Sequence, residues 1–273
     1  MFEFSKWQGY LVNTSEKCYF ISSPWSIDDS VVFGPDSDYN TLAVSLVQFM
    51  NSIGIEVESL QCEDSQIDMN FLNIALRFDE NISHGEWTIH CSSNASLSIS
   101  KSKPTNFPIP ENLTEIDKSK YDLINKAWKK ETAIENVSQG AYISSQQYSE
   151  SLGSRINLTA QSGNHNIWPP RILNEQGDYY GSEEVKLSNV CNIESWTKLS
   201  AAGAPSEFSI RAPILGGIST AYVSFEYGIK GVFLLVDDEG TLPEIGSKGE
   251  IVVRRIYGQE GQMRYGTKLR IID

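Results

Sequence analysis

Five short β-rich runs lie close together in the C-terminal part of the chain, and they constrain the fold more than any other feature. Glycine, proline and aspartate turns separate them. The runs are Cys191–Leu199, Ala221–Tyr227, Val232–Val236, Glu250–Ile256 and Tyr265–Ile271. Five strands at this spacing favour a small closed barrel, and the OB-fold is the commonest five-stranded barrel. We therefore expect residues 185–273 to form an OB-fold.

The first part of the chain combines one clear helix with several short strand candidates. Apolar residues recur at helical spacing between Thr41 and Gly54, and the turn at residues 34–38 precedes them with candidate capping groups. The strand candidates are Cys18–Ile21, Val31–Phe33, Phe71–Phe78 and Trp87–His90. Because Ser100–Pro110 holds three prolines and has the composition of a linker, we expect residues 1–110 to form a mixed α/β domain.

Two helical patterns follow this linker. Leu113–Glu135 carries apolar residues at helix-like spacing with charged residues between them, and Ser144–Leu152 is a second candidate helix. We therefore expect a helical connector over residues 111–153. With 273 residues the chain is long enough for more than one domain, and its overall class is expected to be α+β.

The net charge of the chain limits which partners it can attract. It has 35 acidic and 22 basic residues, and the net charge of -13 repels phosphate backbones and anionic membranes. The one cationic region runs from Ile245 to Asp273, where six basic residues face three acidic ones. We therefore expect neither membrane binding nor nucleic-acid binding.

The four cysteines indicate neither a zinc site nor a disulfide framework. Cys18, Cys62, Cys91 and Cys191 are widely spaced, and no CxxC pair occurs. The start of the sequence lacks the basic and apolar segments of a secretory signal. No run reaches the roughly 18 apolar residues of a membrane-spanning helix. We therefore expect a cytoplasmic protein with reduced thiols.

Residues 154–184 follow the outline of a zinc ribbon without its ligands. The segment Ala160–Arg171 ends in Trp-Pro-Pro-Arg and resembles the ribbon motif CxxCGxxxFPPR, which a second pair of cysteines follows. The four positions that align with these cysteines are Ala160, Gly163, Asn174 and Gly177. Because none of these side chains is a usable zinc ligand, we expect a degenerate ribbon that binds no metal.

The segments after this ribbon follow the order of a known family. They are Leu187–Thr197, Ala212–Pro213, Tyr222–Glu226, Glu244–Val253 and Tyr265–Arg270. Their order and spacing resemble the zinc-ribbon/OB-fold proteins that serve thiolases and hydroxymethylglutaryl-CoA synthases. The resemblance covers Ser154 to Ile271, a little over a hundred residues.

What this resemblance implies is a non-catalytic scaffold. Proteins of this family dock on thiolase-superfamily enzymes and help to hold or channel acyl-CoA intermediates, and the chemistry resides in the partner. The resemblance implies that the residues that dock on the partner are Trp168, Pro169, Pro170 and Arg171. The cationic region either forms a solvated basic surface or contacts coenzyme A phosphates or an acidic partner, with the candidates Arg254, Arg255, Lys268 and Arg270. No cofactor is implied.

A second, shorter resemblance lies near the N-terminus. Val31–Asp38 followed by Thr41–Val44 is similar to the Gly-Pro-Asp-Glu-Asp…Thr-Met-Ala-Val segment of hydroxymethylglutaryl-CoA synthases. A full thiolase fold needs far more chain than lies before Ser154. We therefore interpret residues 1–110 as at most a truncated relic of that fold without catalytic activity.

Two other functions stay open at this point. A thiolase-type enzyme needs a nucleophilic cysteine close to a histidine, and His90-Cys91 is the one adjacent pair in the sequence. Because neighbours on a strand point to opposite faces, we interpret Cys91 as structural. The other alternative is an OB-fold module for single-stranded nucleic acid, which needs a basic groove and stacking aromatics. The candidates for stacking are Tyr222, Phe225, Tyr227, Phe233 and Tyr265.

Overall fold

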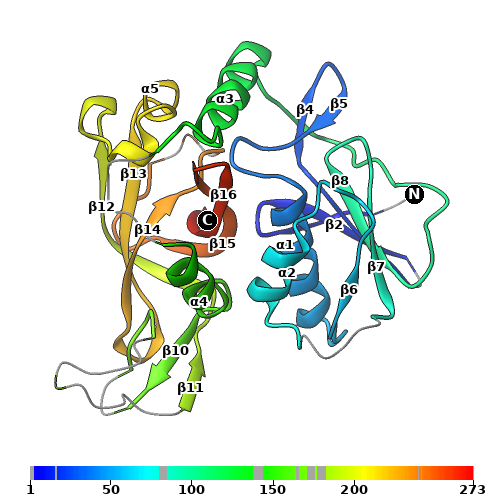
Figure 1. The fold of residues 1–273 in the computed structure, drawn as a ribbon, viewed down its shortest axis with the longest axis horizontal. Coiled ribbons are helices and arrows are strands. Elements are labelled where there is room, and N and C mark those ends of the chain that lie inside the picture. Colours follow the sequence, from blue (N-terminus) through cyan, green and yellow to red (C-terminus); the bar gives the residue numbers. More distant parts are fainter. Residues whose placement is uncertain are drawn as a thin grey trace. The chain divides into compact units, whose positions relative to one another are not determined.

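The chain divides into two compact units in a computed structural model of the protein (Figure 1). Unit 1 is Met1–Leu123 and unit 2 is Ile124–Asp273, so the division falls within the expected connector at 111–153. The structure describes residues 3–15, 17–79, 85–137, 144–163, 166–170, 176, 183–238, 240 and 242–272. Both units combine helices with sheets, which confirms the expected α+β class.

Unit 1 is built on a six-stranded sheet. Its strand order is β1 (Ser5–Trp7), β2 (Tyr10–Ser15), β3 (Cys18–Ser22), β8 (Ser96–Ser100), β7 (Trp87–Cys91) and β6 (Leu60–Gln61). The neighbours are antiparallel except for β6 and β7, which run parallel. A smaller sheet has the strand order β5 (Ser30–Val32), β4 (Trp25–Ile27) and β9 (Thr114–Glu115).

Helix α1 (Tyr39–Ser52) covers the six-stranded sheet and confirms the helix predicted after the turn at residues 34–38. Asp38 caps its first turn with two reciprocal hydrogen bonds. Its side chain accepts one from the Thr41 backbone N–H, and the Thr41 hydroxyl accepts the other from the Asp38 backbone N–H. Gly54 has a φ of +81°, and the chain leaves the helix there. The buried side of α1 packs against β3 and β8.

The strand predicted for Phe71–Phe78 is wrong, because this segment forms helix α2 (Met69–Leu76). Asp68 starts the helix, since its side chain accepts a hydrogen bond from the Phe71 backbone N–H at 3.0 Å. Phe71, Leu72 and Ala75 then form a buried stripe at helical spacing. A short apolar run fits either a strand or a helix, and here the cap and the contact with α1 decide.

Unit 2 contains the closed five-stranded barrel that the sequence predicts. Around the barrel the order is β12 (Val190–Leu199), β13 (Ile218–Ser224), β14 (Lys230–Leu235), β16 (Gln262–Ile272) and β15 (Lys248–Gln259). Neighbouring strands are antiparallel except for β14 and β16, which are parallel. Figure 1 shows the barrel with its strands coloured from yellow to red.

Alternating side chains fill the barrel. On β13, Ala221 and Val223 are buried while Tyr222 between them is exposed, and the same alternation gives the buried Phe233 and Leu235 on β14. The core also includes residues from outside the barrel, namely Leu158, Ala160 and Leu187. The chain before the barrel is therefore part of the same core.

The remaining elements of unit 2 lie around the barrel. They are the end of α3 (Lys118–Glu131), α4 (Ser145–Ile156), the two-stranded sheet of β10 (Thr159–Ser162) and β11 (Glu183–Lys186), and α5 (Ala212–Leu215). The described part of the unit also contains three short 3-10 turns, at Ala201–Gly203, Ser206–Phe208 and Glu226–Gly228.

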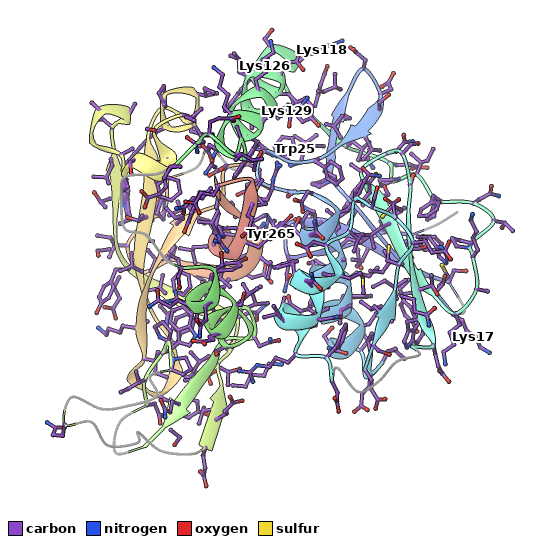
Figure 2. All side chains as sticks on the ribbon, in the orientation of Figure 1. Lys17, Trp25, Lys118, Lys126, Lys129 and Tyr265 are labelled. Carbon is purple, nitrogen blue, oxygen red and sulfur yellow. The ribbon has the colours of Figure 1, made fainter. Side chains whose placement is uncertain are left out.

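Helix α3 illustrates how one buried face attaches an outer element to the rest of unit 2. It buries Ala127 and Trp128, while Lys126 and Lys129 are exposed (Figure 2).

None of the helices in the described ranges is long and apolar enough to cross a membrane.

Candidate ligand site on the barrel

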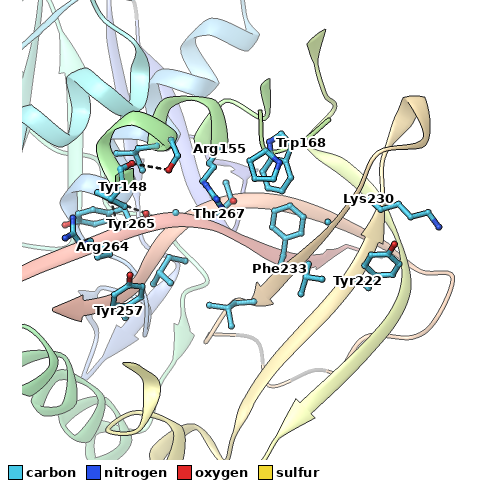
Figure 3. A pocket seen from close by; sticks show the side chains of 18 residues that line it. Tyr148, Arg155, Trp168, Tyr222, Lys230, Phe233, Tyr257, Arg264, Tyr265 and Thr267 are labelled. Carbon is cyan, nitrogen blue, oxygen red and sulfur yellow. Dashed lines mark hydrogen bonds between the residues drawn. The ribbon is translucent and has the colours of Figure 1, made fainter. Parts of the chain in front are cut away.

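The site begins where two barrel strands diverge. The parallel pairing of β14 with β16 covers Leu234↔Lys268 and Leu235↔Leu269. The residues that precede Leu234 on β14 pair with β13 but not with β16, so the barrel closes through two residue pairs here and leaves an opening between the two strands beside them. Helix α4 and the segment around Trp168 contribute to the lining of this opening (Figure 3).

Helix α4 is fastened to the free edge of β16 through Tyr148. The Tyr148 hydroxyl accepts a hydrogen bond from the Tyr265 backbone N–H at 2.8 Å and donates one to the Tyr265 carbonyl at 3.1 Å. The Arg264 guanidinium lies 4.6 Å from the centre of the Tyr148 ring, and its Nη2 donates to Ser145 Oγ at 3.1 Å. The Tyr148 side chain thus bonds the backbone groups of Tyr265 that a neighbouring strand would otherwise bond.

Trp168 closes the opening from the ribbon side. Its ring stacks on Phe233 with ring centres 5.1 Å apart and planes 24° apart, and it lies 6.4 Å from the Phe225 ring. Gly231 allows this approach, because a Cβ at that position would come within 3.2 Å of the Trp168 ring and 2.8 Å of Phe233. The indole is therefore packed against the barrel itself.

These elements enclose a cavity of about 620 Å³. Its apolar walls come from α4, β14 and β15, with Leu152, Phe233, Leu234 and Ile256 among them. Figure 3 shows Lys230 and Tyr222 at one end of the lining and Arg264 at the other. The cavity therefore combines apolar walls with cationic side chains, Lys230 and Arg264 toward its ends and Arg155 between them.

The Lys230 end is exposed and carries one ion pair. Lys230 Nζ lies 2.6 Å from Glu194 Oε2 and 5.5 Å from the centre of the Tyr222 ring. The hydrogen bond between the two charged groups raises the pKa of Lys230 and lowers the pKa of Glu194. Because this pair is open to water, it contributes little to stability and is easily exchanged for another anion.

The side chains of the lining determine which ligands the cavity can accept. The lining holds Ser, Thr and Tyr hydroxyls with Lys and Arg side chains, and it contains no Cys, His, Asp or Glu among the residues that the structure describes. The described lining thus offers no thiol nucleophile and no imidazole or carboxylate as a general base. Apolar walls with cations beside them accommodate a ligand with an apolar arm and anionic groups.

The predicted docking residues divide between the cavity and the undescribed part of the chain. Trp168 and Pro169 line the cavity, and Pro170 is half-buried beside them. Arg171 lies outside the described residues. Trp168 is held by Phe233 and is not a free surface anchor, so truncating it will also affect the fold of unit 2.

The structure describes two of the four positions that align with zinc ligands. Ala160 is fully buried in the barrel core and pairs with Val185 across β10 and β11, whereas Gly163 is exposed. Asn174 and Gly177 lie outside the described residues. Within the described ranges, no group of three or more His, Cys, Asp or Glu side chains is placed to hold a metal ion.

The four candidate phosphate contacts do not come together on one exposed face. Lys268 is buried, with Nζ 2.9 Å from Asp237 Oδ1, and Arg254 is fully buried. Arg255 lies with its guanidinium 4.4 Å from the centre of the Trp128 ring. The remaining candidate is Arg270, which lies 3.7 Å from Glu250 and is partly exposed.

Lys268 belongs to a buried ionic cluster that sequence reasoning missed. Its centre is Arg211, whose side chain is 1% exposed and whose Nε lies 2.8 Å from Glu131 Oε1. Arg211 Nη1 lies 2.8 Å from Asp237 Oδ2, and Arg211 Cζ lies 3.7 Å from the centre of the Trp128 ring. Burial raises the pKa of Glu131 against the opposing effect of Arg211.

Sequence reasoning also missed the groups that shape the cavity. Tyr148 and Arg264 are separated by more than a hundred positions, and no local pattern pairs them. The stacking candidates Tyr222, Phe233 and Tyr265 do line the cavity. Of these, only Tyr222 is exposed, because Phe233 and Tyr265 are buried.

The sequence was also compared with models of known protein families and with curated proteins. No family model matches the chain, and no curated protein matches it significantly.

Proposed function

We propose that this chain is a non-catalytic accessory subunit of the cytoplasm that docks on a thiolase-superfamily enzyme and helps to hold its acyl-CoA intermediate. The observation that carries the proposal is the barrel cavity of about 620 Å³, with its apolar walls and its three cationic side chains, Lys230, Arg155 and Arg264. The resemblance of residues 154–271 to zinc-ribbon/OB-fold proteins supplies the class of partner.

The topology of the barrel supports the OB-fold part of this proposal. In chain order, its neighbours are the first, second, third, fifth and fourth strands, and the third and fifth are parallel. This is a Greek-key arrangement, as in the OB-fold, which binds its ligands on the face of the second and third strands. The cavity is lined by Tyr222 of β13 and by residues 230–234 of β14, together with residues of α4, β15 and β16.

The cavity fits one part of an acyl-CoA well. Ligand cavities for small molecules have volumes of about 300–1,000 Å³ and mostly apolar walls, with a few placed polar groups. The pantetheine arm and a short acyl chain would contact Leu152 and Ile256. Phosphate groups would meet Lys230, which exchanges Glu194 for the ligand, and Arg155 of α4.

The degenerate ribbon supports docking in a different way. Leu158, Ala160 and Leu187 pack into the barrel core, so apolar burial stabilises the start and end of this segment without zinc. Pro170 and Arg171 are not among the four positions that align with zinc ligands. We propose that they contact the partner enzyme, as part of an interface of about 1,600 Å².

Calorimetric titration of the intact chain with acetyl-CoA tests the ligand. We expect binding in the micromolar range, and Val232→Glu should weaken it at least tenfold. Val232 lines the cavity and is 66% exposed, so a carboxylate there repels the phosphates without disturbing the core. The matched control is Ile245→Glu, which places the same charge at a residue that is 72% exposed and outside the lining.

If Val232→Glu and Ile245→Glu bind acetyl-CoA equally well, the cavity is not the site. Docking is tested separately, by size-exclusion chromatography of the chain with a purified thiolase-superfamily enzyme. The unmutated chain should elute with the enzyme, and Arg171→Ala should release it. Separate elution of the two unmutated proteins would refute the scaffold.

A second candidate function is binding of single-stranded nucleic acid. The observation that favours it is Tyr222, which is 38% exposed on β13 with Lys230 beside its ring. The net charge of -13 weighs against it. Micromolar affinity for a single-stranded oligonucleotide at physiological salt, without acetyl-CoA binding, would favour this function over the scaffold.

A further inference from the structure

The sheet of unit 1 brings two of the four cysteines together. Strands β6 and β7 are parallel, and Gln61 pairs with Thr88. Cys62 therefore leaves β6 beside the last residues of β7, where Cys91 lies. The two thiols are hydrogen-bonded to each other, and both residues are half-buried free cysteines.

The two thiols are electronically unequal. The hydrogen bond from Cys91 is the main cause that lowers the pKa of Cys62 to about 7, and burial opposes it. The Asp64 backbone N–H, 3.4 Å from Cys62 Sγ, adds to the lowering. The same hydrogen bond raises the pKa of Cys91, as does burial. At neutral pH about half of the Cys62 side chains are therefore thiolates, while Cys91 stays the protonated thiol that donates to them.

The charged groups around the pair allow one negative charge and oppose a second. The carboxylates of Glu63 and Asp64 act against ionisation of Cys62, and Asp64 also raises the pKa of Cys91. Burial raises the pKa of Tyr39 to about 12, with a smaller contribution from Cys91. A thiolate beside a protonated second thiol is the arrangement of redox-active cysteine pairs.

Two other uses of the pair have less support. A metal site needs further ligands, and no cluster of three His, Cys, Asp or Glu side chains occurs in the described part of the chain. An acyl-transfer nucleophile needs a general base, but the side chain that activates Cys62 is a proton donor, the thiol of Cys91. Thiol–disulfide chemistry needs only the two sulfurs.

We propose that Cys62 and Cys91 form a reversible disulfide when the chain meets a peroxide. The Cys62 thiolate attacks one peroxide oxygen, the O–O bond breaks, and protonation of the leaving hydroxide gives water and a sulfenic acid on Cys62. Cys91 then loses its proton and attacks the Cys62 sulfur, which forms the S–S bond and releases a second water. The peroxide is reduced by two electrons, and two equivalents of a small thiol restore the pair.

Alkylation rates of the wild-type chain test the activation of Cys62 without any mutation. At pH 7 a thiol with a pKa of about 7 is about half ionised, against about 1% for a pKa of 9. The thiolate fraction is thus roughly fiftyfold higher for the more acidic thiol. Its thiolate is also a weaker nucleophile, which lowers the rate by about six- to tenfold. We therefore expect iodoacetamide to modify Cys62 at least about fivefold faster than Cys18, whose pKa burial raises.

Peptide mapping after treatment with hydrogen peroxide tests the bond itself. We expect a Cys62–Cys91 linked peptide that disappears on reduction with dithiothreitol. In Cys91→Ala the linked peptide is lost, a sulfenic acid on Cys62 is trapped by dimedone, and alkylation of Cys62 slows several-fold because the donor is gone. Cys18→Ala is the matched control and should leave the Cys62–Cys91 peptide unchanged.

The proposal fails if the peroxide-treated wild-type chain yields no Cys62–Cys91 peptide. It also fails if Cys18 or the buried Cys191 is modified as fast as Cys62, because burial raises the pKa of Cys191 to about 12 and should make it inert. Both readouts use the unmutated protein, so they decide the matter even if a cysteine variant does not fold.

Discussion

Replacing Arg211 by Met tests the buried ionic cluster of unit 2. The Arg211 side chain is 1% exposed and lies 2.8 Å from both Glu131 and Asp237. Asp237 keeps Lys268 at 2.9 Å in the variant, but Glu131 loses the cation beside it. Leaving one charge of a buried pair without its partner costs about 3–5 kcal/mol.

Urea unfolding followed by circular dichroism, at pH 5.5 and pH 8, measures this loss. We expect the free energy of unfolding of unit 2 to fall by about 4 kcal/mol at pH 8, or about 10 °C in Tm for a unit of this size. A surface control is Lys230→Met, which breaks the exposed ion pair with Glu194 and should leave the unfolding midpoint of unit 2 unchanged.

The pH dependence follows from the pKa of Glu131, which burial already raises in the wild type. Without Arg211 it rises further, so the folded state binds a proton that the unfolded state has released. Stability gained from that proton is present at low pH and is lost as the pH rises through the folded pKa. The deficit of Arg211→Met should therefore be larger at pH 8 than at pH 5.5. Equal deficits at both pH values, or a loss below about 1 kcal/mol at pH 8, would refute the reasoning.

Three further experiments test other parts of the structure. Trp168→Ala should lower the free energy of unfolding by about 2–4 kcal/mol because the stacking on Phe233 is lost, whereas Trp168→Phe should cost about 1 kcal/mol in the same urea titration. Asp38→Ala removes the cap of α1 and should cost unit 1 about 1 kcal/mol in thermal unfolding. Elemental analysis of chain purified without chelator should find no stoichiometric zinc, since Ala160 fills the first ligand position; one zinc per chain would contradict this.

Much of the fold could be predicted because its causes are local. The strands of the barrel follow from apolar alternation and from the turns between them, and these patterns need only neighbouring residues. Helix α1 follows from Asp38 and the apolar residues after Thr41. The strand predicted for Phe71–Phe78 is wrong because a run of eight residues is compatible with a strand or a helix, and the cap at Asp68 favours the helix.

The candidate site could be predicted only in part. Phe233, Tyr222 and Tyr265 were expected on the barrel as aromatic residues, and Trp168 as part of the ribbon motif. The cavity needs more than these, because it exists where β14 and β16 diverge and α4 is fastened by Tyr148. Pairing between strands so far apart in the chain leaves no periodic signal along it.

The sequence by itself determined the barrel, the first helix and the absence of zinc-binding cysteines, because alternation, capping and residue chemistry are properties of short segments. Only the tertiary structure decided what the charged residues do. Arg211 and Glu131 are 80 positions apart, and Lys268 sits on a strand whose outer face would be solvated in an isolated barrel. Outer elements such as α3 bury that face, so cations that alternation assigns to solvent become paired interior charges.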